Sequence, residues 1–182
     1  MINRVYFDNA ATTAMDPIVV ETMAAAMTRL FGNPSSIHAD GRRARAALEK
    51  ARKTVAYAIG ASIGEVFFTS GGTESSNMVL KGAVRDLGVK RIISTSIEHH
   101  CVLHSLEKLS EFHQTEIVWL SLDKQGRISL SELEVVLKEK EVPTLVSLMH
   151  ANNEIGTMND LEGIGKLCKE YGAFFHSDTV QT

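Results

Sequence analysis

The sequence predicts an α/β domain with a mostly parallel sheet and flanking helices. From residue 66 onward, short apolar runs rich in β-branched and aromatic residues alternate with segments whose apolar residues recur at helical spacing. Since 44% of the 182 residues are hydrophobic and 23% are charged, the composition is that of a folded domain with one sizeable core. The runs that predict buried strands are 66–69, 91–95, 117–120, 145–149 and 173–176.

Two helices are predicted before these strands. After an extended piece at 4–7, Asp16 and Pro17 form a favourable N-cap and first helical position. The apolar residues of this first helix are Val20, Met23, Met27 and Leu30. A break at 32–36 separates it from a second helix, which ends at Gly60 and has apolar residues at Leu48, Ala51, Val55 and Ile59. The charged residues between 42 and 53 are interpreted as the solvated face of the second helix.

Four further helices alternate with the later strands. Their apolar positions are Leu80, Ala83, Val84 and Leu87; Val102, Leu103, Leu106 and Leu109; Leu130, Leu133 and Leu137; and Leu161, Ile164, Leu167 and Tyr171. Ser129 and Glu132 have the spacing of a capping box, and Gly172 is a helix stop.

Charge and cysteine content exclude several classes of protein. With 19 Lys and Arg against 22 Asp and Glu and no basic run, we expect neither a nucleic-acid nor an anionic-membrane partner. No segment approaches the roughly 20 apolar residues of a membrane span, and the start has no apolar run of signal-peptide length. Cys101 and Cys168 fall in helical patterns and are too few for a disulfide framework. These features predict a reduced, cytoplasmic setting.

Polar residues gather where four of the predicted strands end, at 70–75, 96–100, 150–154 and 177–181. In an open parallel sheet, ligands bind outside the carboxyl ends of the strands. We therefore expect these four junctions to lie on one edge of the sheet, with Thr73, His99, Asn153 and Asp178 lining a shared cleft.

The turn formed by Gly71, Gly72 and Thr73 opens a helix, so free N–H groups, a hydroxyl and the positive end of the helix dipole face one point. This arrangement suits an anion, with phosphate as the first choice. A glycine turn of this kind is also common as an ordinary turn between two elements. Neither a dinucleotide-binding fingerprint nor a P-loop is present in the sequence.

Asp178 and three histidines are the other candidates. Asp178 ends an apolar strand and needs a partner there, which is either a ligand cation or a structural group. His99 suits a base, a stacking ring or a metal ligand, and His100 and His104 share a helix face as zinc ligands can. Because no recognised metal-ligand spacing is present, a metal site is the weaker interpretation, and no metal is expected.

Taken together, six segments resemble the NifS/IscS-like cysteine desulfurases of the class V aminotransferase family. They are Tyr6-Phe-Asp-Asn-Ala-Ala-Thr-Thr13, Gly32-Asn-Pro-Ser-Ser-Ile-His38, Phe68-Thr-Ser-Gly-Gly-Thr-Glu-Ser-Ser-Asn77, Glu98-His99, Met149-His-Ala-Asn-Asn-Glu-Ile-Gly156 and His176-Ser-Asp-Thr-Val-Gln181. They occur in the family's order over the whole chain. The resemblance implies the large domain of a fold-type I transferase that uses pyridoxal 5'-phosphate, in truncated form.

The resemblance also implies roles for individual residues. Gly72 and Thr73 would hold the cofactor phosphate, His99 would stack on the pyridine ring as a catalytic residue, and Asp178 would pair with the ring nitrogen. Asn153 and Gln181 would bond the ring substituents. Residues 1–15 would belong to the small domain, and residues 16–182 would form the N-terminal part of the large domain.

The activity implied is conversion of L-cysteine to L-alanine, with sulfur passed to an enzyme persulfide for iron–sulfur cluster assembly or thiolation. The expected partners are L-cysteine, a second copy in a homodimer, and a sulfur-acceptor or scaffold protein. The family's Schiff-base lysine and persulfide cysteine come after Asp178, whereas all ten lysines here precede it. We therefore expect a fragment that is inactive alone.

Alternatives are a selenocysteine lyase or other class V enzyme, a non-catalytic binding or dimerisation fragment, and a metal hydrolase using His99, His100 and His104.

Overall fold

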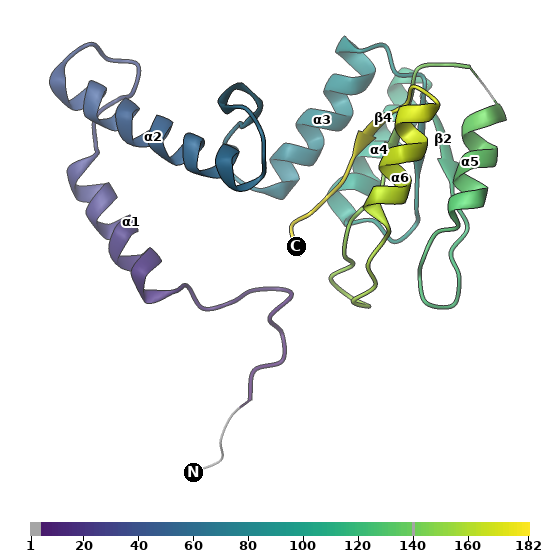
Figure 1. Ribbon diagram of the computed structural model, residues 1–182, viewed down its shortest axis with the longest axis horizontal. Coiled ribbons are helices and arrows are strands. Elements are labelled where there is room, and N and C mark those ends of the chain that lie inside the picture. Colours follow the sequence, from purple (N-terminus) through teal and green to yellow (C-terminus); the bar gives the residue numbers. More distant parts are fainter. Residues whose placement is uncertain (1–4, 140) are drawn as a thin grey trace. The chain divides into compact units, whose positions relative to one another are not determined.

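The computed structural model describes residues 5–139 and 141–182, which divide into two compact units, Met1–Phe68 and Thr69–Thr182 (Figure 1). Each unit is described by itself. Of the predicted extended piece at 4–7, Arg4 lies outside the described residues, and residues 5–7 are exposed and have no regular structure.

The first unit contains the two predicted N-terminal helices. Helix α1, Pro17–Arg29, begins after Asp16, whose Oδ1 accepts a hydrogen bond from the Ile18 N–H at 2.8 Å. The predicted N-cap is thus confirmed. The apolar positions of α1 are exposed, and the helix has no buried residue. Helix α2, Ala39–Ala58, starts well before the first apolar residue of its pattern. Its charged residues between 42 and 53 are exposed as expected except Arg52, which is half-buried and donates to the Val66 carbonyl.

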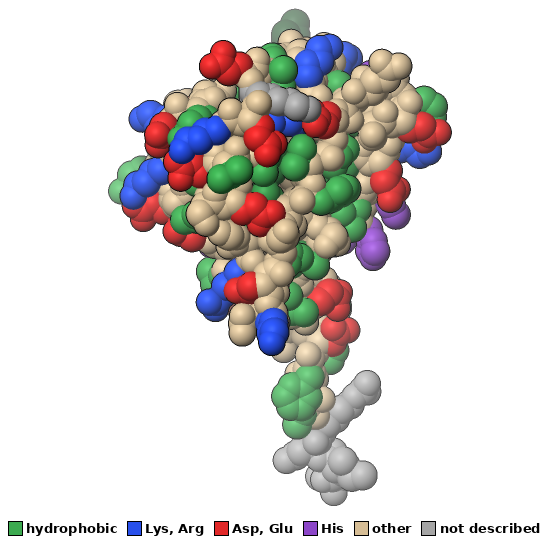
Figure 2. Space-filling model, turned by 90° about the vertical axis from the view of Figure 1, so that its right-hand side faces the viewer, with side chains coloured by type: hydrophobic (Ala, Val, Ile, Leu, Met, Phe, Trp, Pro, Cys, Tyr) green, Lys and Arg blue, Asp and Glu red, His purple; other side chains and the backbone are tan. Residues whose placement is uncertain are grey.

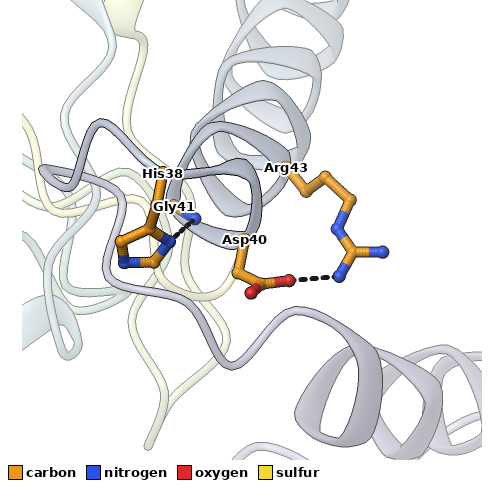
Figure 3. A network of polar contacts seen from close by, with 4 residues as sticks. All are labelled: His38, Asp40, Gly41 and Arg43. Carbon is orange, nitrogen blue, oxygen red and sulfur yellow. Dashed lines mark hydrogen bonds and ion pairs between the residues drawn. The ribbon is translucent and has the colours of Figure 1, made fainter.

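The start of α2 is held by contacts from the preceding loop (Figure 3). His38 Nδ1 accepts a hydrogen bond from the Gly41 N–H at 3.3 Å, and within the helix Arg43 pairs with Asp40. A Cβ on Gly41 would lie 2.5 Å from the Ser36 carbonyl oxygen, so only glycine fits this close approach. The loop 32–38 is therefore packed directly against the first turn of α2.

The predicted strand at 66–69 is wrong. The short 3₁₀ helix η1, Ile63–Glu65, leads into Val66, whose backbone is extended (φ −102°, ψ 120°). However, this segment pairs with none of the described strands, and the Phe67 and Phe68 side chains are 71% and 48% exposed. An apolar run becomes a strand only where a neighbour completes the ladder of hydrogen bonds, and the described residues supply none here.

The second unit is built on a parallel sheet of four strands in the order β2-β1-β3-β4. Its strands are β1 Arg91–Ser94, β2 Glu116–Trp119, β3 Thr144–Ser147 and β4 Phe174–His176, which confirms the other four predicted runs. Ile92 of the central strand β1 is in register with Ile117 and with Leu145. Since every strand runs the same way, their carboxyl ends share one edge.

Helices cover both faces of this sheet (Figure 1). Helices α3, Gly72–Asp86, and α4, His100–His113, pack on the face that carries Ile92 and Leu145. Helices α5, Leu130–Glu139, and α6, Leu161–Glu170, pack on the face that carries Ile93 and Val146. The central side chains of each layer are fully buried, and each such Leu or Ile contributes about 1.5–3 kcal/mol.

Only half of the predicted capping box forms at α5. Ser129 Oγ accepts the Glu132 N–H at 3.4 Å, but the Glu132 carboxylate accepts the N–H of Ser121 at 3.0 Å instead of returning to Ser129. That carboxylate therefore joins the loop after β2 to the helix start.

The surface carries charges of both signs, which are interspersed on the face shown in Figure 2. Within residues 5–139 and 141–182, no helix is both long and apolar enough to cross a membrane.

Candidate functional site

Hydrogen bonds join the segments that follow β1, β3 and β4. Asn152 Nδ2 donates to the Ile97 carbonyl at 2.9 Å, and the Leu148 N–H donates to the His176 carbonyl at 3.1 Å. One step further on, the His150 N–H donates to the Asp178 carbonyl at 2.9 Å. Three of the four polar junctions predicted from the sequence thus meet at one edge of the sheet.

The fourth junction is the glycine turn that opens α3. Gly71 is the N-cap and provides no side chain, and the first amides of a helix have no partner within it. Hydrogen bonds within the turn hold its conformation: the Glu74 carboxylate accepts the Ser70 N–H and the Ser70 hydroxyl, each at 2.6 Å. These hydrogen bonds from Ser70 lower the pKa of Glu74.

The glycine turn and Asp178 share one pocket of about 360 Å³. Its lining comes from the start of α3 and from the segment after β4: Thr69, Gly71, Gly72, Ser75, Ser76, His176, Ser177, Asp178, Thr179 and Val180. A Cβ on Gly72 would lie 2.7 Å from Val180 Cγ2, so a side chain there would push Val180 away. Glycine thus keeps the two walls in contact.

The groups in this pocket suit a small ring compound with an anionic end and a cationic nitrogen. Ser177 Oγ is buried and has no hydrogen-bond partner among the described residues, which leaves a hydroxyl available to a ligand. The start of α3 offers amide donors and a positive dipole end to a phosphate. Asp178 Oδ1 accepts the Val180 N–H at 3.1 Å, and the charge of this half-buried carboxylate remains for a cation. The residues present therefore fit pyridoxal phosphate.

The other sequence-predicted residues lie outside the lining of this pocket. Thr73 is exposed at the second position of α3. His99 is the N-cap of α4, where its Nδ1 accepts the Cys101 N–H at 3.2 Å and lies 3.0 Å from Cys101 Sγ. Asn153 donates to the Glu154 carboxylate at 2.8 Å, and Gln181 is exposed beyond the pocket.

The neighbouring Asn152, which the sequence analysis did not single out, is the buried asparagine. Its Nδ2 donates to the Ile97 carbonyl at 2.9 Å, and its Oδ1 accepts the N–H groups of Glu154 and Ile155. Asn152 thus joins the loop after β3, which includes Asn153, to the loop after β1.

Sequence reasoning gave no role to Glu98, which is buried at the same edge with 5% of its surface exposed. Its Oε1 accepts the Met149 N–H at 2.9 Å and the Thr95 hydroxyl at 3.1 Å. Burial raises the pKa of Glu98 to about 7, and the charge of Asp178 acts in the same direction. An acidic residue three positions after a buried strand was the available signal.

His176, at the end of β4, is a second residue that was missed. Its Nδ1 lies 2.9 Å from the hydroxyl of the fully buried Ser147. Burial lowers the pKa of His176, while the charge of Asp178 opposes this effect. The half-buried His176 therefore lines the pocket beside Asp178.

The histidines considered as metal ligands, and the two cysteines, have local structural surroundings. The rings of His100 and His104 stack with centroids 5.7 Å apart, and the described part of the chain holds no group of three or more metal-ligating side chains. Cys168 is buried in α6, and burial raises its pKa to about 11. Cys101 is half-buried against the α3 and α4 core.

A larger pocket of about 550 Å³ lies at the opposite edge, where β1 and β3 begin. The buried Arg91 in its wall donates to Thr144 Oγ1 at 3.2 Å and to the Val136 carbonyl at 3.1 Å. Because parallel sheets bind ligands at their carboxyl edge and this guanidinium is already bonded, we assign the site to the smaller pocket.

Comparisons with known proteins agree with this fold. The family "Aminotransferase class-V" matches residues 5–182. The cysteine desulfurase IscS of Dictyoglomus turgidum is 46% identical over 100% of this chain and 46% of its own length. A solved structure of a NifS-like protein superimposes with a TM-score of 0.91, at 40% identity over 98% of this chain and 50% of that one. A structure of SspA in complex with cysteine has a TM-score of 0.89, at 35% identity over 97% and 51%.

The chain spans about half the length of the relatives that it matches. The range matched by the family, residues 5–182, includes the glycine turn, the sheet edge and Asp178. Members of this family use pyridoxal phosphate. The chain belongs to the class V aminotransferase family, in which it is similar to the IscS- and NifS-like cysteine desulfurases.

Proposed function

We propose that this chain forms the N-terminal part of the pyridoxal phosphate-binding domain of a cysteine desulfurase. The observation that carries the proposal is the pocket in which the glycine turn of α3 faces Ser177 and Asp178. The end of the pocket at the start of α3 favours an anion, and the end at Asp178 favours a cation. The cofactor carries an anionic phosphate at one end and a protonated ring nitrogen at the other. In this proposal residues 16–182 belong to the large domain and residues 1–15 to the small one.

The residues have distinct tasks in this proposal. The Gly72 and Thr73 amides and the Thr73 hydroxyl hold the phosphate, His99 stacks on the ring, and Asn153 and Gln181 bond its substituents. Asp178 keeps the ring nitrogen protonated by pairing with it. A bound, protonated pyridoxal ring supplies an electron sink for breaking bonds at the substrate's α-carbon.

The whole protein would act on L-cysteine, release L-alanine and pass sulfur to an acceptor or scaffold protein, as a cytoplasmic homodimer. The substrate class is supported by the similarity to a cysteine desulfurase and to SspA, whose structure contains cysteine. The described lysines are all exposed, and none lines the pocket. The 182-residue chain alone is therefore proposed to lack both the covalent cofactor link and sulfur transfer.

Adding pyridoxal phosphate to the purified 182-residue chain should give non-covalent binding and no sulfide release from L-cysteine. Binding is expected because the phosphate end and Asp178 lie in one pocket, whereas turnover needs a lysine there. The measurements are cofactor absorbance in a titration, sulfide release, and borohydride trapping followed by intact mass. Sulfide turnover with a borohydride-stable adduct on an upstream lysine would contradict this account, and absence of any binding would remove the proposed site.

Replacing Thr73 by Val should weaken pyridoxal phosphate binding by about tenfold, or about 1.5 kcal/mol, through loss of one hydroxyl donor to a charged acceptor. Thr22→Val in α1 is the matched control, because that hydroxyl only donates within its own helix, to the Ile18 carbonyl at 2.7 Å. Equal affinities for Thr73→Val and the unmodified chain in the same titration would remove Thr73 from the phosphate site.

A further inference from the structure

Glu98 lies where the ends of β1 and β3 meet. Its Oε1 accepts the Thr95 hydroxyl, directly after β1, and the Met149 N–H, two residues after β3. Removing the carboxyl group would leave a buried amide without a partner, which is costly. The Glu98 side chain therefore clamps the backbone after β3 to the end of β1.

The clamped backbone reaches Asp178 through one further hydrogen bond. His150, next to Met149, donates its N–H to the Asp178 carbonyl at 2.9 Å. The Asp178 carboxylate accepts the Val180 N–H at 3.1 Å, and Val180 closes against Gly72. Three links thus connect Glu98 with both walls of the pocket.

The Glu98 and Asp178 carboxyl groups also interact through charge. Burial chiefly, and the charge of Asp178 to a lesser degree, raise the pKa of Glu98 to about 7 against the hydrogen bonds from Met149 and Thr95. Glu98 Oε2 is buried without a partner among the described residues, so the ionised form lacks a donor there. The other titratable groups on the adjoining segments are His99 and His100 at the start of α4, His150 and Glu154 after β3, and His176 in β4. Near neutral pH, Glu98 therefore changes charge beside Asp178.

We propose that Glu98 is a positioning residue that holds Asp178 toward a cationic ring nitrogen in the pocket and, through its own charge, sets how strongly the pocket attracts that cation. This inference rests on the proposed function of the pocket. Glu98 touches no ligand; it acts through the Met149–His150 backbone and through the electrostatic field at Asp178. A negative charge on Glu98 adds to that of Asp178, so the ionised form attracts the cation more strongly.

The clamp is tested by amide hydrogen exchange in the 182-residue chain without cofactor. Glu98→Ala should speed exchange at Met149 and His150 at least tenfold, because the acceptor is gone. Glu98→Gln keeps a carbonyl oxygen at Oε1 and should retain most of the protection, and Glu107→Gln on the exposed side of α4 is the matched control. If Glu98→Ala does not fold, Glu98→Asp, which is one methylene shorter, takes its place. Unchanged exchange at both amides would overturn the clamp.

The charge effect is tested by titrating pyridoxal phosphate between pH 5.5 and pH 8.5. The affinity of the unmodified chain and of Glu107→Gln should rise about threefold to tenfold with a midpoint near pH 7. Glu98→Gln should still bind but lack this step, which a purely structural role would not predict. The same step in Glu98→Gln would overturn the inference. If the unmodified chain binds no cofactor at any pH, the proposed function fails, and the exchange experiment still decides the clamp.

Discussion

Between pH 5 and pH 8, the contribution of Glu98 to the free energy of unfolding of residues 69–182 should fall by about 2 to 3 kcal/mol as its carboxyl group loses a proton. The pKa of Glu98 is raised from 4.5 to about 7 in the folded chain, so between these values the folded state binds more protons than the unfolded state. Stability due to this group is therefore fully present at low pH and is lost as the pH rises to about 7.

His176 acts in the opposite direction in part of the same range. Burial lowers its pKa below 6.5, so its contribution to stability rises with pH up to that value. Comparison with Glu98→Gln isolates the Glu98 contribution, since His176 is present in both chains. The measurement is urea unfolding at pH 5 and pH 8, followed by fluorescence of Trp119, the single tryptophan, which lies in β2. An identical pH dependence in both chains would show that Glu98 is not held in the buried position described.

Replacing Asp178 by Asn should weaken pyridoxal phosphate binding by about 100-fold, or about 3 kcal/mol, through loss of a charge-assisted hydrogen bond to the ring nitrogen. The Asn side chain keeps an oxygen that accepts the Val180 N–H, so the loop after β4 should keep its shape. The effect is then one of charge and not of folding.

The control for this variant is Asp86→Asn at the far end of α3. Asp86 pairs with Arg85 on the surface at 2.7 Å and lies at the end of α3 opposite to the glycine turn. Both variants should show the far-ultraviolet circular dichroism of the unmodified chain, and only Asp178→Asn should lose affinity in the absorbance titration. Equal affinities in the two variants would remove Asp178 from the cation end of the site.

Most of the strands and helices could be predicted from local sequence patterns. A strand that is buried on both faces of a parallel sheet is a continuous apolar run in the sequence. The runs at 91–95, 117–120, 145–149 and 173–176 all became strands, and each predicted helix formed. The run at 66–69 has the same character but lacks a pairing partner among the described residues. Pairing is a long-range property that a local window does not contain.

The start of α2 and the role of Glu98 were missed for related reasons. Helix α2 begins with small and charged residues capped by His38, which is outside the favoured N-cap types. The environment of Glu98 comes from Met149, 51 positions along the chain, and from Asp178. Similarly, nothing in the sequence distinguishes the buried Asn152 from Asn153, because only the fold decides which of the two faces Ile97. By contrast, the glycine turn and Asp178 were predicted to lie close together, and they line the same pocket, although the segment 66–69 before the turn is not a strand of the described sheet.

The central claim is that the glycine turn and Asp178 hold the two ends of one cofactor. Its most direct test compares the backbone amide NMR shifts caused by pyridoxal phosphate with those caused by pyridoxal, which lacks the phosphate. With pyridoxal phosphate, the amides of Gly72 and Thr73 should shift together with those of Asp178 to Val180. With pyridoxal, the shifts at Gly72 and Thr73 should largely disappear while those after β4 persist. Shifts confined to the Arg91 and Thr144 pocket, or equal shifts at Gly72 with both compounds, would contradict the account.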